Sequence, residues 1–292
     1  MNGILIVDKP TDWTSFDVIA KLRGILGTRK LGHSGTLDPM ATGVLPVFAG
    51  PAAKAVDLQT DHTKAYRAVV RFGLSTDTGD VTGTVLQQAH TQVTAKDLEQ
   101  VLPRFTGDIQ QMPPMYSAIK VNGTALYKLA RQGITVERKL RPVTIHQLTL
   151  VEQCGPQDFV LDVDCSKGTY VRSLVEDLGS ALGVPATLAG LRRTRAGIFG
   201  LEHSHTLEEI QQAKEQGTLD QLLVAVDTVF AQLPAVTVNE KGEQRLRNGA
   251  LCYRTGQPAG RCRIYGPQGF LGLGQVLEDA SLKAEKLFVE RA

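Results

Sequence analysis

The apolar period changes midway through residues 158–183, and this change limits most strongly what the chain can fold into. Phe159, Leu161 and Val163 alternate with other positions, which is typical of a strand with one buried face. From Val171 onward the apolar residues recur at helical spacing instead. Strand and helix stretches follow one another along the whole chain without strict strand–helix–strand alternation. The predicted fold class is therefore α+β, and a doubly wound parallel sheet is disfavoured.

The other predicted elements follow the same two periods. Thr14 and Asp17 have the spacing of a capping box, and Gly27 closes the helical pattern that begins there. Pro103 weakens a second helix candidate. Strands are predicted near 3–10, 64–73 and 191–200, and further helices near 206–216 and 218–232.

Two segments differ in texture from the rest. Residues 111–143 open with paired prolines and carry repeated basic residues, which predicts a mobile, positively charged excursion with one short helix. Beyond Pro234 the pattern is of short strands separated by glycine turns. We therefore expect a large domain over 1–233, with the excursion inserted in it, and a small β-rich module over 234–292.

Composition excludes several classes of protein. The 292 residues are 42% hydrophobic and 21% charged with a net charge of +2, which is ordinary for a globular chain. The four cysteines show no C-x-x-C pair, which argues against a zinc site and favours a reducing compartment. No stretch reaches the ~18 apolar residues of a membrane helix, and no secretory signal is visible. We expect a cytoplasmic protein, and a monomer because no heptads occur.

The stretch "GHSGTLDPMATGVLPV", from Gly32 to Val47, presents one carboxylate, Asp38. Pro39 disfavours a helical conformation for Asp38, so the carboxylate is expected in a turn or an extended segment. Glycines at 32, 35 and 43 are expected to let the backbone approach something flat or bulky.

The chemistry of such a loop has several interpretations. Asp38 alone could cap the loop as an Asx-turn. A phosphate-binding loop lacks its lysine, and a metal site would need more ligands than the nearby His33. Glycosidases normally need two carboxylates. A single carboxylate fits nucleophilic, covalent catalysis.

The loop and several further motifs resemble the TruB family of tRNA pseudouridine synthases. The resemblance extends over nearly the whole chain, with the motifs in the same order: "VDKPTDWTSFDVI" at 7–19, "HSGTLDPMATGVLP" at 33–46, "KAYRA" at 64–68, "PPMYSAIKVNG" at 113–123, "CSKGTYVRSL" at 165–174 and "LRRTRAGIF" at 191–199. It implies a pseudouridine-synthase catalytic domain on a mostly antiparallel mixed sheet, a thumb-like insertion at about 111–143, and a PUA-like RNA-binding module at the C-terminus.

The resemblance also implies the reaction. The N1–C1′ bond of a uridine breaks, the base turns, and C5 joins C1′, with no cofactor and no metal. Asp38 is expected to act in its ionised form, and Arg172 to pair with it and lower its pKa. Tyr66 is expected to stack on the base. Without the family match, Arg172 would be interpreted as a surface or structural arginine, and Tyr66 as a core residue.

The remaining site residues fall into two groups by resemblance. Those around the flipped nucleotide are His33, Tyr170 and Leu191. Those supporting the loop are Lys9, Pro10, Gly35 and Thr36. If residues 170–172 are extended, Tyr170 and Arg172 point to one side.

The expected partner is the T-arm of tRNA, with the uridine at position 55 as target. Flipping it requires binding energy from basic residues, for which the candidates are 111–143, "RRTR" at 192–195, Arg245, Arg247, Arg254, Arg261 and Arg263. The alternatives are a tRNA-folding chaperone, a synthase that depends on a guide RNA, and an enzyme of free uracil compounds. The insertion and the absence of long lysine-rich tails favour a synthase that needs no guide RNA.

Overall fold

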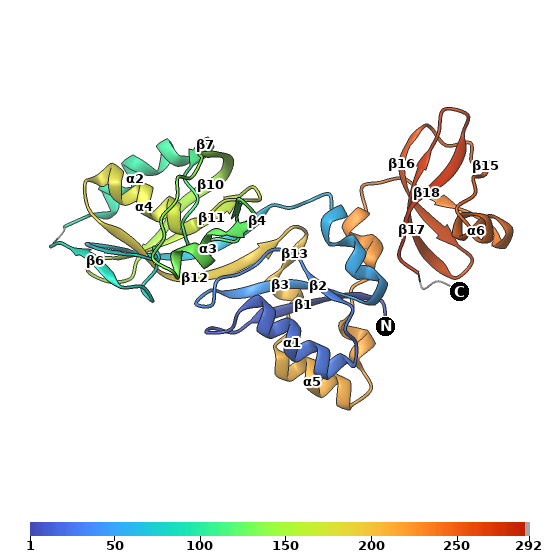
Figure 1. The fold of residues 1–292 in the computed structure, drawn as a ribbon, viewed down its shortest axis with the longest axis horizontal. Helices are drawn as coiled ribbons and strands as arrows, with labels where there is room; N and C mark the ends of the chain where they lie inside the picture. Colours follow the sequence, from blue (N-terminus) through green and yellow to red (C-terminus); the bar gives the residue numbers. More distant parts are fainter. Residues whose placement is uncertain (91, 290–292) are drawn as a thin grey trace.

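The computed structural model describes residues 1–90 and 92–289, and the molecule is elongated in three parts (Figure 1). A nine-stranded sheet runs through the first two parts in the order β1-β3-β12-β4-β11-β10-β7, with β2 and β13 as additional edge strands. Of its pairings, only β12 with β3 is parallel. The predicted α+β class with a mostly antiparallel mixed sheet is confirmed. Its strands are β1 Gly3–Lys9, β2 Leu31–His33, β3 Thr42–Ala49, β4 Lys64–Phe72, β7 Gly107–Gln111, β10 Arg141–Gln153, β11 Asp158–Cys165, β12 Ala186–Ala196 and β13 Phe199–Gly200.

Helices cover the sheet in two places. Helices α1 (Ser15–Leu26) and α5 (Leu207–Glu215) lie beside β1 and β3, and α2 (Ala95–Val101) and α4 (Val171–Leu182) lie at the other end (Figure 1). The predicted capping box and the terminating Gly27 of α1 are both present. The α1–α5 pair and the α2–α4 pair each cover a separate apolar core. One continuous sheet therefore carries two distinct hydrophobic cores. The two halves meet where β3, β12 and β4 are neighbours.

The helix predicted over 218–232 is wrong. The chain there forms only two short 3₁₀ turns, η4 (Leu219–Leu222) and η5 (Val226–Phe230). The physical reason is a tertiary contact, because Val224 exchanges backbone hydrogen bonds with Ile4 on the edge of β1. A helix would have used those groups internally. Pro103 has the expected effect, since α2 ends in a 3₁₀ turn, η2 (Leu102–Phe105).

The C-terminal part is the predicted β-rich module. Five strands pair in the order β14-β16-β17-β18-β15 around a small apolar core. Phe288 of this module stacks on Phe230 of η5, and Phe270 packs beside the same ring at a tilt, so the two phenylalanines tie the module to the preceding part. The elements are β14 Ala235–Thr237, α6 Glu240–Arg247, β15 Cys252–Arg254, β16 Gly260–Gly266, β17 Gly269–Val276 and β18 Ser281–Leu287.

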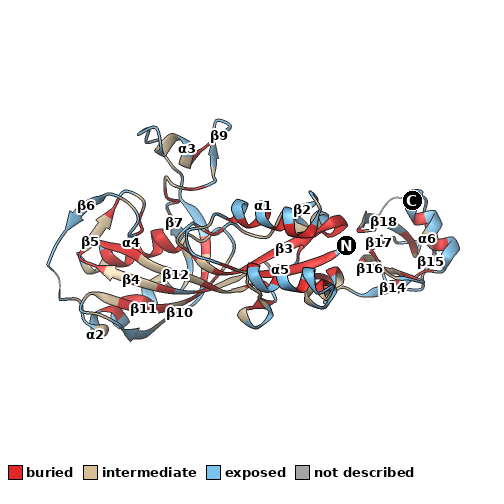
Figure 2. Cartoon of the chain, turned by 90° about the horizontal axis from the view of Figure 1, so that it is seen from below, coloured by how far each residue is buried: buried red, intermediate tan, exposed pale blue. Residues whose placement is uncertain are grey.

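The basic excursion stands off the body of the molecule, with α3 and β9 at its tip (Figure 2). Most of its residues are exposed or half-buried. Its elements are β8 (Lys120–Val121), β9 (Thr124–Ala125) and α3 (Leu126–Ala130), which is the short helix expected there. The turn-rich stretch after β4 forms the hairpin β5 (Leu74–Thr76) and β6 (Val85–Gln88), and η1 (Gly50–Leu58) follows β3.

Candidate active site

Buried side chains of β1 and α1 form hydrogen bonds with the loop between β2 and β3, which carries Asp38. The Lys9 ammonium, fully buried at the end of β1, donates to the carbonyl oxygens of Pro10, Trp13 and Pro39. Burial lowers the pKa of Lys9 to about 8. Ser15 Oγ accepts the Leu37 N–H at 2.9 Å. The residues on both sides of Asp38 are therefore anchored to the protein interior.

Asp38 forms an ion pair with Arg172. Arg172 Nε lies 2.9 Å from Asp38 Oδ2, and the arginine side chain is 5% exposed whereas the aspartate is 36% exposed. The other two guanidinium nitrogens donate to the carbonyl oxygens of Thr78 and Tyr116, each at 2.8 Å. The predicted ion pair is present, and Arg172 is fixed by three separate segments while Asp38 stays accessible.

Arg172 reaches Asp38 from a helix and not from an extended segment. Tyr170 caps α4, and Arg172 lies in its first turn. The Tyr170 backbone exchanges two hydrogen bonds with the Gln111 side chain, at 2.8 and 3.1 Å, which fixes where the helix begins. An extended 170–172 segment, the condition under which Tyr170 and Arg172 would point to one side, is therefore not present. The apolar period had already placed the change to helix at Val171.

Burial raises the pKa of Asp38, and the Arg172 charge opposes that rise without cancelling it. The sequence predicted a lowered pKa from the arginine alone. Asp80, on the β5–β6 hairpin, adds to the rise because it is a second, buried negative charge nearby. Its carboxylate accepts from Thr78 and Thr82. Asp80 could not be predicted from the sequence, since an aspartate in a turn-rich stretch carries no signal of its own.

Tyr66 lies in β4 and is 7% exposed. Burial raises the pKa of its hydroxyl, and the neighbouring Arg193 guanidinium partly opposes this. Asp38 is close enough to Tyr66 and to Tyr170 to influence the pKa of both. The structure thus brings Asp38, Arg172, Tyr66 and Tyr170 together, as their assignment to one site requires.

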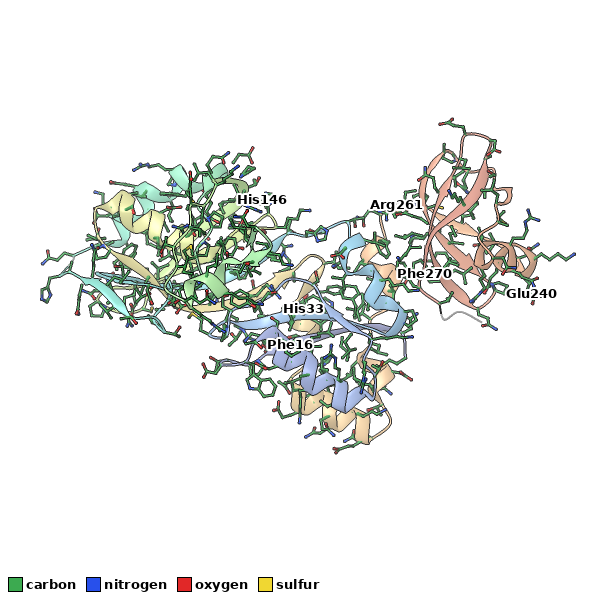
Figure 3. The ribbon with its side chains drawn as sticks, viewed as in Figure 1. Phe16, His33, His146, Glu240, Arg261 and Phe270 are labelled. Atoms are coloured by element: carbon green, nitrogen blue, oxygen red, sulfur yellow. The ribbon has the colours of Figure 1, made fainter. Side chains whose placement is uncertain are left out.

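The other two residues assigned to the nucleotide lie on the sheet. Leu191, half-buried on β12, packs against the same core cluster that contains Tyr66. His33 ends β2 in the middle part of the molecule, away from the C-terminal module that carries Arg261 (Figure 3). Burial, helped by the Arg193 charge, lowers the pKa of His33, so the imidazole is neutral at pH 7. Its Nδ1 is buried without a hydrogen-bond partner.

Gly35 and Gly43 of the loop are explained by the backbone conformation and by strand packing, without a ligand. A Cβ at Gly43 would collide with the Arg193 carbonyl oxygen, because β12 and β3 run side by side there. Gly35 has a φ of +83°, a left-handed conformation that favours glycine. The expectation that Gly43 makes room for a bulky partner is corrected, because that room is taken by a strand. Thr36 and Pro10, two other residues of the supporting loop, are exposed.

The basic residues proposed as phosphate contacts differ in their availability. Arg193 was expected to contact RNA phosphates at the surface. It is fully buried, so this expectation is wrong. Arg192, Arg195 and Arg261 are half-exposed but pair with Asp8, Asp164 and Glu285. Arg247 pairs with Glu243, Arg245 donates to the Leu251 carbonyl and Arg263 to that of Leu233. The side chain of Arg254 lies outside the described residues.

Within residues 1–90 and 92–289, no group of three or more His, Cys, Asp or Glu side chains is arranged to hold a metal ion. Over the same residues, no helix combines the length and the apolar character needed to cross a membrane.

Comparison with known families matches most of the chain. Residues 23–171 match the N-terminal domain of the TruB family of pseudouridylate synthases, and residues 172–231 match the tRNA pseudouridylate synthase B C-terminal domain. The curated tRNA pseudouridine synthase B of Pseudomonas putida (strain F1) is 44% identical over 98% of this chain and 95% of its own length. That of Halalkalibacterium halodurans is 44% identical over 93% and 91%.

Solved structures give the same fold. A chain of the crystal structure of a Cbf5-Nop10-Gar1 complex superposes with a TM-score of 0.73 at 27% identity, over 99% of this chain and 85% of that one. A chain of an H/ACA RNP bound to a substrate RNA gives 0.73 at 26% identity, over 99% of this chain and 86% of that one. With these matches, the sheet and the loop define an isomerase of the pseudouridylate synthase class. The chain belongs to the TruB family.

Proposed function

We propose that the protein isomerises uridine to pseudouridine at position 55, in the T-loop of tRNA, with Asp38 as the reacting carboxylate and without a cofactor. The observation that carries the proposal is the Asp38–Arg172 pair, in which the arginine is buried and the aspartate remains accessible. The relatives of similar length named tRNA pseudouridine synthase B support tRNA as the substrate.

The atoms of the reaction balance within the substrate. The N1–C1′ bond breaks, a C5–C1′ bond forms, and the proton on C5 is released while N1 gains one. The Asp38 carboxylate, ionised when it acts, adds to the nucleotide or stabilises its charge and leaves unchanged. Tyr66 lies beside it to stack on the base, and Tyr170 and Leu191 line the uracil pocket. His33 supports the flipped nucleotide.

Flipping the base costs a few kcal/mol, which contacts with the rest of the RNA must offset. We assign these contacts to the excursion at 111–143, which reaches the site through the Tyr116 carbonyl on Arg172. The domain division at 233/234, a PUA-like RNA-binding role for the module after it, a monomeric state and a cytoplasmic location belong to the same proposal.

The test is tritium release from a tRNA transcript labelled at C5 of uridine. We expect release of one tritium per tRNA by the purified chain alone, and none from a transcript with cytidine at position 55. Release only after a guide RNA is added would instead place the chain with the guide-dependent complexes. Tight binding without any release would favour the chaperone.

A further inference from the structure

Arg193 is the largest side chain among those fully buried in the described residues. It lies on β12, where this strand pairs with β3 on one side and with β4 on the other. In these ladders Gly43 faces it in the parallel pair and Tyr66 faces it in the antiparallel pair. Arg193 is therefore placed between the strand that follows the Asp38 loop and the strand that carries Tyr66.

The guanidinium holds both ends of the loop. Arg193 Nε donates to the Val44 carbonyl oxygen at 2.6 Å, and Nη2 donates to the Gly35 carbonyl oxygen at 3.0 Å. These two acceptors bracket Asp38 in the sequence. A side chain that binds both fixes the width of the loop between them.

The same guanidinium acts on Tyr66. It lies within electrostatic reach of the Tyr66 hydroxyl, and its charge pulls the pKa of that hydroxyl down against burial, while burial lowers the pKa of Arg193 itself.

The positive charge of Arg193 has no acidic partner among the described residues, where no carboxylate forms an ion pair with it. The charge of the guanidinium lowers the pKa of its neighbours His33 and Lys64. A buried and unpaired guanidinium is expensive, and an apolar side chain of similar size would be cheaper for the fold. Packing alone therefore does not account for an arginine at this position.

We propose that Arg193 is a positioning residue of the reaction, which fixes the Asp38 loop relative to Tyr66 and keeps a positive charge beside the Tyr66 hydroxyl. This inference rests on the proposed function. It gives Arg193 no contact with RNA, and it assigns its effect to the chemical step.

The test compares Arg193→Met with wild type in single-turnover tritium release at saturating enzyme, with tRNA binding and thermal unfolding measured in parallel. We expect the rate to fall about 100-fold, the range found when one fixed donor of a reaction site is removed. The tRNA Kd should change less than about threefold. Arg193→Lys keeps the positive charge but loses the forked geometry of the guanidinium. Its single-turnover rate should be about tenfold higher than that of Arg193→Met.

A double-mutant cycle that combines Arg193→Met with Tyr66→Phe separates a positioning role from a merely structural one. If Arg193 acts through Tyr66, the Met substitution should cost less than about tenfold in the Tyr66→Phe background, because residues that act as a unit are not additive. Should Arg193→Met fail to fold, the same cycle is run with Arg193→Lys, and a smaller loss is again expected once the Tyr66 hydroxyl has been removed. The matched control is Arg67→Met, one residue from Tyr66 on the exposed face, which should leave the rate unchanged.

Three results would overturn the inference. The first is an unchanged rate in a folded Arg193 variant, and the second is weaker binding with an unchanged saturated rate. The third is a full loss repeated in the Tyr66→Phe background. Failure of the proposed function is distinct from all three, since wild type would then release no tritium.

Discussion

Two kinds of arginine–aspartate pair occur in this protein, and their bond lengths do not tell them apart. Arg67 pairs with Asp162 at 2.9 Å on the exposed face of β4 and β11, and Arg172 pairs with Asp38 at the same distance. The arginines differ sharply in exposure, at 54% for Arg67 and 5% for Arg172, whereas the two aspartates are similar, at 42% and 36%. The two pairs therefore differ in whether the guanidinium is buried or exposed to water.

The exposed arginine binds its carboxylate through two parallel hydrogen bonds. Arg172 has, besides Asp38, two backbone carbonyls from segments far apart in the chain. Solvent therefore screens the first pair more strongly than the second, in which only the aspartate is exposed. The comparison predicts that equal substitutions in the two pairs have very unequal effects.

The largest effect is expected for Arg172→Met. Loss of the guanidinium leaves Asp38 without its partner and frees the Thr78 and Tyr116 carbonyls, so turnover should fall about 10²–10³-fold. Arg172→Lys should restore little, because an ammonium cannot span the three acceptors. Single-turnover rates on the T-loop transcript measure this, and a loss below tenfold would remove the distinction between the two pairs.

Lys9→Met should mainly affect stability. It leaves the carbonyls of Pro10, Trp13 and Pro39 without their buried donor, so the free energy of unfolding should fall by about 2–4 kcal/mol. Urea unfolding with an unchanged m-value would measure it. A stable variant with a large loss of rate would instead make Lys9 part of the chemistry.

Asp38→Asn should have a smaller, pH-dependent effect on stability. The folded pKa of Asp38 is raised, so the stability that its protonated form contributes is present below the ordinary value of 3.8 and is lost as the pH rises through the folded pKa. At pH 7 the Asn variant should therefore have a higher Tm than wild type. The difference should narrow as the pH falls towards 4. A difference that widens towards acid would mean that Arg172 outweighs burial.

The smallest effect is expected for Arg67→Met. Exposed pairs of this kind contribute about 0–1 kcal/mol. Stability should fall within that range, with turnover within about twofold of wild type. A loss of turnover comparable to that of Arg172→Met would show that the exposed face of β4 also takes part.

The sequence predicted most of what local patterns determine. The capping box of α1, the change of period before Val171 and the loop around Asp38 needed only neighbours in the chain, and the family resemblance supplied the pairing with Arg172. The failures required partners distant in sequence. Val224 was predicted in a helix but forms backbone hydrogen bonds with β1 instead. Arg193 was predicted as a surface arginine but is buried between β3 and β4.

The measurement that tests the account most directly is tritium release by Asp38→Asn, with tRNA binding followed at the same salt concentration. The account predicts that turnover is lost while the Kd stays close to that of wild type, because the variant keeps the shape of the loop and removes only the charge. Turnover at the wild-type rate would contradict it.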